Sequence, residues 1–292
     1  MSCGSIRKST SVSLSSSITN RSIIHKTVGN SHGPITRLVS PSDLGQITKP
    51  FVFLDAFKMP AGPRTFKGFG YHPHSGIATV TLMLEGSMWY EETHSKGEVE
   101  AGGVEFFRAA SGAWHTGGAI GEGAVRGYQL WLSLPASQEL ETPDSFYLKA
   151  KDVPREGPAR IILGRYGTVQ SPIPSVTGIN YLDVRMMKGE KWIYNVPSNH
   201  TVAFISVWKG KIKVFDDVVK ADELVVLEES GGGNLNFASD DDEACFILGT
   251  AEKHPHDLVL GSYSVHTCKE SLIKGEANIK KVGAEMKAKG IL

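Results

Sequence analysis

The sequence predicts a mainly β protein with two similar β domains and a helix at the C-terminus. Three observations predict it: many short apolar runs between turn residues, an internal repeat, and a helical apolar pattern confined to the end of the chain. Short strands with few helical periods between them favour packed sheets or barrels over an α/β arrangement. The 292 residues suffice for one large or two medium domains.

Short runs of β-branched and aromatic residues, bounded by Gly, Asn, Ser or Pro, predict the strands. The first series comprises FVFLDAF, ATVTLML, SMWYEE, VEFFRA and YQLWLSL; the second comprises ARIILGRY, NYLDVRM, KWIYNV, TVAFISVW, KIKVF, ELVVLEE and CFILGTA. Each series contains an apolar strand, a turn at Gly86 or Gly210, an amphipathic strand, a polar turn and another apolar strand. This self-similarity, at a spacing of about 124 residues, predicts a duplicated β domain.

The domain boundaries are placed at the ends of the two strand series and at the prolines between them. We expect a first domain over residues 33–142, a linker over 143–157, a second domain over 158–253, and a return segment with a helix over 254–292. The helix is expected because apolar residues recur at helical spacing after Thr267 and Glu270, whose spacing is that of a capping box.

Residues 1–32 are expected to be a disordered or leader segment. The chain has no Asp or Glu before residue 43, and its start is rich in serine. An organelle transit peptide has the same composition, so this alternative stays open. There is no apolar segment typical of a secretory signal.

Charge and cysteine content limit the partners and the compartment. The 31 basic and 31 acidic residues cancel, which argues against direct nucleic-acid binding. The three cysteines show no CxxC spacing, so we expect a reducing, cytoplasmic setting. No apolar run is long enough to span a membrane. We expect a monomer, with a small aromatic molecule or a protein as its partner.

Three histidines are candidate metal ligands. In GFGYHPHSGIATVTLMLEG, His72 and His74 are two residues apart, and on a strand they would point to the same side. His115, in RAASGAWHTGGA, would add a third ligand from another strand and leave coordination positions open, as in catalytic sites. Scattered surface histidines are the alternative. Imidazole suits Fe, Ni, Cu, Zn and Mn, so the ligands do not identify the metal.

The segments HPHSGIATVTLMLEG, GGVEFFRAASGAWHTGG and GYQLWLSLP, in this order, resemble the pirin family of bicupins. The resemblance runs from about Gly33 to the C-terminus. It implies two cupin-type β-barrels packed face to face and one divalent transition metal in the first barrel, iron foremost, with Ni, Mn, Zn or Cu as alternatives. It also implies quercetin (flavonol) 2,3-dioxygenase activity or, in eukaryotes, transcriptional co-regulation.

The duplication supports an asymmetry between the two domains. Matching Gly86 with Gly210 sets Val196 and Ser198 opposite His72 and His74. Neither replacement is a metal ligand of the imidazole type. The second domain is therefore expected to hold no metal and to serve as a structural or interaction module.

The chain departs from the family pattern at two carboxylates. The family glutamate two residues after the third histidine is Gly117 here, and a glutamate four residues after the HPH is Ala78. Glu105, on a neighbouring predicted strand, is the candidate replacement for acid–base work. Gln129 is a candidate for bonding a ligand histidine or a substrate; a structural amide is the alternative.

Three hypotheses therefore stand. The first is a metal-dependent oxidoreductase of the flavonol dioxygenase kind. The second is a metal-binding regulatory protein that acts through a partner without turnover. The third is a degenerate cupin that binds no metal tightly. The two missing glutamates favour the second and third hypotheses over the first.

Overall fold

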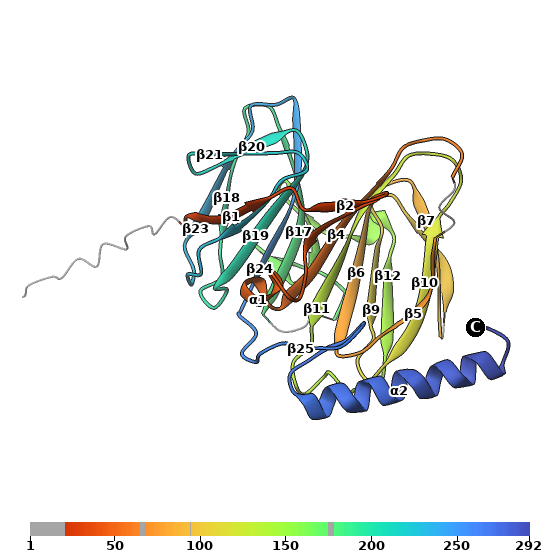
Figure 1. Cartoon of the computed structure of the whole chain (residues 1–292). Helices are drawn as coiled ribbons and strands as arrows, with labels where there is room; N and C mark the ends of the chain where they lie inside the picture. The colour runs from red at the N-terminus through yellow and green to blue at the C-terminus, as the bar shows by residue number, and fades with distance from the viewer. Residues whose placement is uncertain (1–20, 65–67, 94, 175–177) are drawn as a thin grey trace, which may run out of the picture.

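The computed structural model describes residues 21–64, 68–93, 95–174 and 178–292, and it shows two β-barrels side by side with a long helix beneath the first (Figure 1). Each barrel is built from one seven-stranded sheet and one four-stranded sheet. The mainly β, two-barrel architecture with a C-terminal helix is as predicted.

The first barrel contains all five predicted strands of the first series. Its large sheet has the order β12 (Asp144–Leu148), β9 (Val104–Arg108), β6 (Ile77–Glu85), β11 (Val125–Ser133), β4 (Phe51–Met59), β3 (Ile35–Val39), β2 (Asn30–His32). Its small sheet has the order β5 (Phe69–His74), β10 (Ala113–Ala119), β7 (Ser87–Glu92), β8 (Lys96–Glu100).

The second barrel repeats this plan. Its large sheet has the order β1 (Ile23–Thr27), β22 (Leu224–Leu227), β19 (Val202–Lys209), β24 (Glu243–Ala251), β17 (Ile179–Met187), β14 (Ala159–Leu163), β13 (Arg155–Glu156). Its small sheet has the order β18 (Lys191–Asn195), β23 (Asn234–Ala238), β20 (Lys211–Val214), β21 (Asp217–Lys220). The other elements are the pairs β15 (Arg165–Tyr166) with β16 (Val169–Gln170) and β25 (Val259–Leu260) with β26 (Val265–His266), and the helices α1 (Gly45–Thr48), η1 (Ala150–Asp152) and α2 (Lys269–Ala288).

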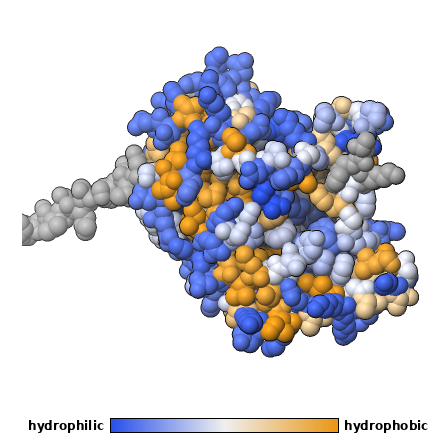
Figure 2. All heavy atoms as spheres, viewed as in Figure 1, coloured by the Kyte–Doolittle hydropathy of each residue, from blue (hydrophilic) through white to orange (hydrophobic). Residues whose placement is uncertain are grey.

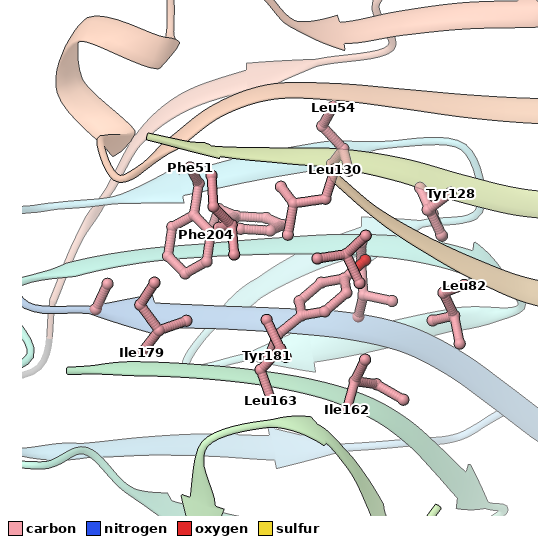
Figure 3. Packing of buried hydrophobic residues seen from close by; sticks show 14 of the residues in the cluster. Phe51, Leu54, Leu82, Tyr128, Leu130, Ile162, Leu163, Ile179, Tyr181 and Phe204 are labelled. Atoms are coloured by element: carbon pink, nitrogen blue, oxygen red, sulfur yellow. The ribbon is translucent and has the colours of Figure 1, made fainter. Parts of the chain in front are cut away.

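The largest hydrophobic core lies between the two large sheets. Side chains of both barrels meet there, and Figure 3 shows Phe51 and Leu130 on one side facing Phe204 and Tyr181 on the other. The rings of Phe51 and Phe204 meet edge to face at 5.0 Å. The Tyr128 hydroxyl, at 2.9 Å from Ser206 Oγ, adds a hydrogen bond within this apolar layer. The barrels are thus joined by a continuous core.

Burial patterns separate the two kinds of sheet. Strands β18 and β20 alternate exposed and buried residues, because one face of the small sheet meets solvent. Strands β6 and β24 are buried along most of their length, because one face lines its own barrel and the other meets the inter-barrel core.

The two barrel interiors are filled differently. Aromatic side chains, including Trp192, Phe237 and Phe246, pack inside the second barrel, with Phe237 and Phe246 stacked at 4.9 Å. The first barrel instead contains a cavity of about 580 Å³. A second pocket, of about 730 Å³, lies against the second barrel and is lined by residues including Tyr166, Asn180 and His200. The cavity of the first barrel is the one that lies beside the three histidines.

The N-terminal segment is more structured than expected. Residues 1–20 lie outside the described residues, but residues 21–32, expected to be disordered or a leader, form β1 and β2. Strand β1 pairs with β22 of the second barrel, and Arg21 donates hydrogen bonds to the carbonyls of His200 and Gly232. Pairing to a free sheet edge orders this segment despite its polar composition.

The expected linker, residues 143–157, also contains regular structure. Strand β12 adds to the edge of the first large sheet by pairing with β9, and Arg108 forms an ion pair with Asp144 there. Strand β13 then joins the second large sheet. The chain thus passes between barrels through only a few residues around η1, and Pro154 lies within this shorter crossing.

Helix α2 is continuous through two glycines. A Cβ at Gly275 would lie 2.5 Å from Ser75 Oγ, and a Cβ at Gly283 would lie 2.7 Å from the ring of Trp114. Glycine at these positions therefore lets the helix lie directly on the barrel, where the Trp114 indole donates to the Ile279 carbonyl at 3.0 Å.

The predicted capping box is wrong. Cys268 occupies the N-cap position without a side-chain cap, and the Thr267 hydroxyl donates instead to the buried carboxylate of Glu139 at 2.8 Å. The Thr267 side chain therefore bonds a residue distant in the sequence, Glu139, and not the N-terminus of its own helix.

No helix among the described residues is both long and apolar enough to cross a membrane. On the face seen in Figure 2, hydrophobic residues form several groups separated by hydrophilic ones.

Candidate metal centre

Three histidines converge at one end of the first barrel. Strands β5 and β10 pair so that His115 lies opposite His72 and Ala113 lies opposite His74. Directly opposed residues share a face, and so do residues two apart on one strand. The ring centroids lie 4.4 Å apart for His72 and His115, and 5.0 Å apart for each of the other two pairs.

Backbone carbonyls fix the orientation of two imidazoles. His72 Nδ1 lies 2.8 Å from the Gly70 carbonyl, and His74 Nδ1 lies 3.1 Å from the Tyr263 carbonyl. A carbonyl only accepts, so each Nδ1 carries the proton and each Nε2 keeps its lone pair. His115 Nε2 is buried without a hydrogen-bond partner. This arrangement is typical of metal-binding histidines, whose other ring nitrogen is bonded to the protein.

The donor set fits a metal ion. One ligand atom from each histidine lies within 4.8 Å of the others. Burial lowers the pKa of His72, of His74 (to about 3) and of His115, and neighbouring imidazoles contribute for the last two. The rings are therefore neutral near pH 7, which is the form that binds metals. A buried unpaired His115 Nε2 carries a cost that a bound cation would remove.

Aromatic side chains hold the histidines in place. Phe107 stacks on His115 with centroids 4.8 Å apart, and Trp131 packs against His74 at 4.7 Å. Phe53 in turn lies parallel to Trp131 at 4.0 Å. The cavity therefore has a rigid, flat apolar wall next to the three imidazoles.

The 580 Å³ cavity opens directly beside these imidazoles. This volume lies within the range of small-molecule sites in proteins. Its walls include Phe53, Glu105, Gln129, Trp131 and Tyr263. A mainly apolar wall with a few polar groups is typical of sites that orient a flat organic ligand.

Glu105 and Gln129 both face the cavity. Glu105 is 3 % exposed and accepts a hydrogen bond from Thr81 at 2.6 Å. Burial, together with the charge of Glu92, raises the pKa of Glu105 to about 7, although the Thr81 bond opposes this shift. Gln129 Oε1 lies 3.0 Å from the same hydroxyl, and its Nε2 is buried without a partner. Glu105 lies outside the three-histidine cluster.

The positions of the two missing glutamates have different surroundings. Gly117 follows a β-bulge in β10, and a Cβ there would lie 2.9 Å from the Trp89 carbonyl. Ala78 is fully buried in the core between the barrels, on the opposite face of β6 from Thr79 and Thr81. A carboxylate at position 78 would therefore point away from the cavity in this chain.

Sequence reasoning missed several groups around the site. The Tyr263 carbonyl comes from a segment 189 residues from His74, and nothing in the sequence links the two. Buried Glu92, which accepts from Ser95 and Tyr147, lies opposite His115 in the sheet. The alternation of β7 could have placed Glu92 inside the barrel. The sequence contains a second HPH motif, His254 to His256, which lies outside the site: His254 Nε2 bonds the Leu134 carbonyl near the barrel interface.

Comparison with known proteins agrees with this architecture. The Pirin family model matches residues 34–132. A Pseudomonas aeruginosa protein, provisionally named a quercetin 2,3-dioxygenase, is 32% identical over 238 residues, which cover 74% of this chain and 79% of that protein. A pirin-like protein of Arabidopsis thaliana is 33% identical over 239 residues, covering 76% and 75% of the two chains.

A solved structure supports the fold. The crystal structure of a quercetin 2,3-dioxygenase from Acinetobacter baumannii superposes with a TM-score of 0.80 at 22% identity, covering 90% of this chain and 98% of that one. The match extends over both barrels. The sequence relatives and the three-histidine first barrel together lead to one conclusion: this chain belongs to the pirin family.

Proposed function

We propose that this protein binds one divalent transition metal ion through His72, His74 and His115 and oxidises a small aromatic molecule with dioxygen in the adjacent cavity, as a quercetin 2,3-dioxygenase does. The observation that carries the proposal is the convergence of three neutral imidazoles, one with a buried unpaired nitrogen, on the edge of a 580 Å³ cavity. The relatives named for quercetin 2,3-dioxygenase activity support the choice of reaction.

The chain's own residues would perform the proton chemistry. A bound metal would supply Lewis-acid activation of a coordinated oxygen. Glu105 would take the proton of a substrate hydroxyl, because a carboxylate whose pKa is about 7 is matched to general-base work near neutral pH. Trp131 and Phe53 would hold a flat ring, and Gln129 would bond its oxygen substituents.

Several finer assignments belong to the same proposal. We propose iron as the resident metal, a cytoplasmic monomer, and metal binding by the first barrel alone. The two cysteines of the described chain, Cys245 and Cys268, are free thiols, which supports a reducing compartment.

Metal content of protein purified without a metal-affinity column tests the proposal. We expect one transition metal ion per chain, lost in the His72→Ala/His74→Ala variant. His254→Ala is the matched control, because it removes a buried histidine outside the cavity. Oxygen uptake with quercetin by the loaded protein then distinguishes an enzyme from a metal-binding regulatory protein. Absence of metal after anaerobic incubation with Fe, Mn, Zn, Ni and Cu would refute both.

A further inference from the structure

A row of polar side chains crosses the inner face of the large sheet on six neighbouring strands, and four of its members, Arg37, Asp55, Glu105 and Gln129, line the cavity. Each member lies directly opposite the next in the register of the large sheet, so all share the inner face. The row runs Tyr147, Glu105, Thr81, Gln129, Asp55, Arg37. Its neighbouring row is mainly apolar and contains Phe107 and Trp131 opposite Thr79. Polar groups are thus concentrated at one depth of the cavity.

Thr81 stands between two acceptors but has a single hydrogen to donate. Its Oγ1 lies 2.6 Å from Glu105 Oε2 and 3.0 Å from Gln129 Oε1. A hydroxyl has one donor hydrogen and can accept as well. It therefore cannot serve an ionised Glu105 and the Gln129 oxygen at the same time.

Two arrangements of hydrogens satisfy both hydrogen bonds, the one between Glu105 and Thr81 and the one between Thr81 and Gln129. If Glu105 carries a proton, it donates to Thr81, which donates to Gln129 Oε1, and Gln129 Nε2 faces the cavity. If Glu105 is ionised, Thr81 donates to the carboxylate, and the Gln129 amide turns over so that Nε2 donates to Thr81 and Oε1 faces the cavity. The two amide orientations occupy almost the same space.

We propose that Glu105, acting through Thr81, sets which atom of the Gln129 amide faces the cavity, so that one proton determines whether this wall donates or accepts a hydrogen bond. Gln129 is then the residue that selects ligand substituents, and Thr81 is a positioning residue. Gln129 lines the cavity, and its Nε2 is buried without a hydrogen-bond partner, which supports this assignment because it is a donor awaiting a partner.

The neighbouring charged groups do not compete for the hydrogen bonds that link Glu105, Thr81 and Gln129. On one side, Glu92 already accepts from Tyr147 at 2.7 Å and from Ser95 at 2.8 Å, while Tyr90 stacks on Tyr147 at 4.0 Å. Tyr147 therefore donates to Glu92 and not to Glu105. These carboxylate and phenol groups are the titratable groups next to Glu105.

On the other side, Asp55 is held by Arg37 through two hydrogen bonds, so the Gln129 amide is free to turn. The three histidines, also on the cavity wall, are neutral at the pH of interest because burial lowers their pKa. Burial raises the pKa of Glu105 to about 7, so the exchange falls near neutral pH.

The inference deepens the proposed function and rests on it for the class of substrate. Before proton transfer, the phenolic hydroxyl donates to the ionised Glu105, and Gln129 presents its amide oxygen to a second hydroxyl of the substrate. When the substrate O–H bond breaks and the proton forms an O–H bond on Glu105, Gln129 becomes a donor to the resulting anionic oxygen. The same residue would thus bond the substrate in both forms, with its polarity reversed at the moment of transfer.

Nuclear magnetic resonance of the metal-free full chain tests the inference without a ligand or activity. The side-chain amide of Gln129, assigned by its loss in Gln129→Leu, and the carboxyl carbon of Glu105 are followed across neutral pH. We expect both to change with one midpoint. Thr81→Val should leave Glu105 titrating but uncouple Gln129, while Thr81→Ser should retain the coupling. The exposed Gln46 amide, which bonds the Pro41 carbonyl, is the internal control.

An unchanged Gln129 signal across the titration of Glu105, or coupling that persists in Thr81→Val, would overturn the inference. Binding of phenol and anisole to the wild type gives a second readout. Because phenol can donate and anisole can only accept, the ratio of their affinities should change by about fivefold in favour of phenol above the midpoint, and this change should be absent in Glu105→Gln. If neither binds, the aromatic-substrate proposal fails, while the resonance experiment still decides the amide orientation.

Discussion

Replacing Glu105 with Gln should make the protein more stable at alkaline pH and change little at acidic pH. The carboxyl of Glu105 is buried, and its pKa is raised from 4.5 in the unfolded chain to about 7 in the folded one. An acid with a raised folded pKa contributes its stability below the unfolded pKa and loses it as the pH rises through the folded pKa. The amide of the Glu105→Gln variant would keep a neutral hydrogen-bonding group at the same place.

The magnitude follows from the shift. A difference of about 2.5 pKa units corresponds to about 3 kcal/mol of free energy of unfolding. About 2.5 kcal/mol of this is lost between about pH 5 and pH 8.5, where wild-type Glu105 changes from mostly protonated to mostly ionised. The remaining titrations are common to both proteins and cancel in the difference.

Urea unfolding of wild type and Glu105→Gln, followed by tryptophan fluorescence at several pH values, measures this difference. We expect the variant to become progressively more stable than the wild type between about pH 5 and pH 7, and the difference to level off above about pH 8. Glu91→Gln, on the outer small sheet, is the matched control and should show no such trend. A stability difference that is constant from acid to alkaline pH would refute the reasoning, because Glu105 would then titrate alike in the folded and unfolded chains.

Three further changes test the packing. Gly275→Ala should destabilise the protein by about 1–3 kcal/mol, because its Cβ would lie 2.5 Å from Ser75 Oγ and this outweighs the better helix propensity of alanine. We expect faster amide hydrogen exchange in α2, and unchanged exchange would contradict the prediction. Ser206→Ala should lower the free energy of unfolding by about 1–3 kcal/mol, because it leaves the buried Tyr128 hydroxyl unpaired. In denaturant unfolding, the double variant with Tyr128→Phe should lose less stability than the sum of the two single variants. Strict additivity would contradict a hydrogen bond between the two side chains. Phe204→Ala should lower the free energy of unfolding by about 3–5 kcal/mol, because it opens a cavity between the barrels. An unchanged melting temperature in calorimetry would show that this core does not hold the two barrels together.

The sequence was informative where a single physical rule dominates. Period-two alternation and turn glycines predicted the strands, and the shared face of residues two apart predicted that His72 and His74 point together. His115 was predicted to add a third ligand from another strand, and it does lie beside the other two because β5 and β10 are paired. These inferences need only local geometry and one pairing.

Other features depend on contacts between distant parts of the chain. The Thr267 hydroxyl has two available partners, and a carboxylate 128 residues away won over the local helix terminus. The order of residues 21–32 comes from sheet edges that the segment itself does not encode. The raised pKa of Glu105 depends on burial and on Glu92, which sequence spacing does not place. Tertiary partners decide such cases.

Strand β1 has a consequence for how the molecule can be divided. It is the first described strand of the chain, yet it completes the large sheet of the second barrel before β2 and β3 join the first. A cut between the barrels would therefore separate a barrel from one of its own strands. The two halves are interlocked by an exchanged strand, and a chimaera that replaces the second barrel with that of a relative must also replace residues 21–27.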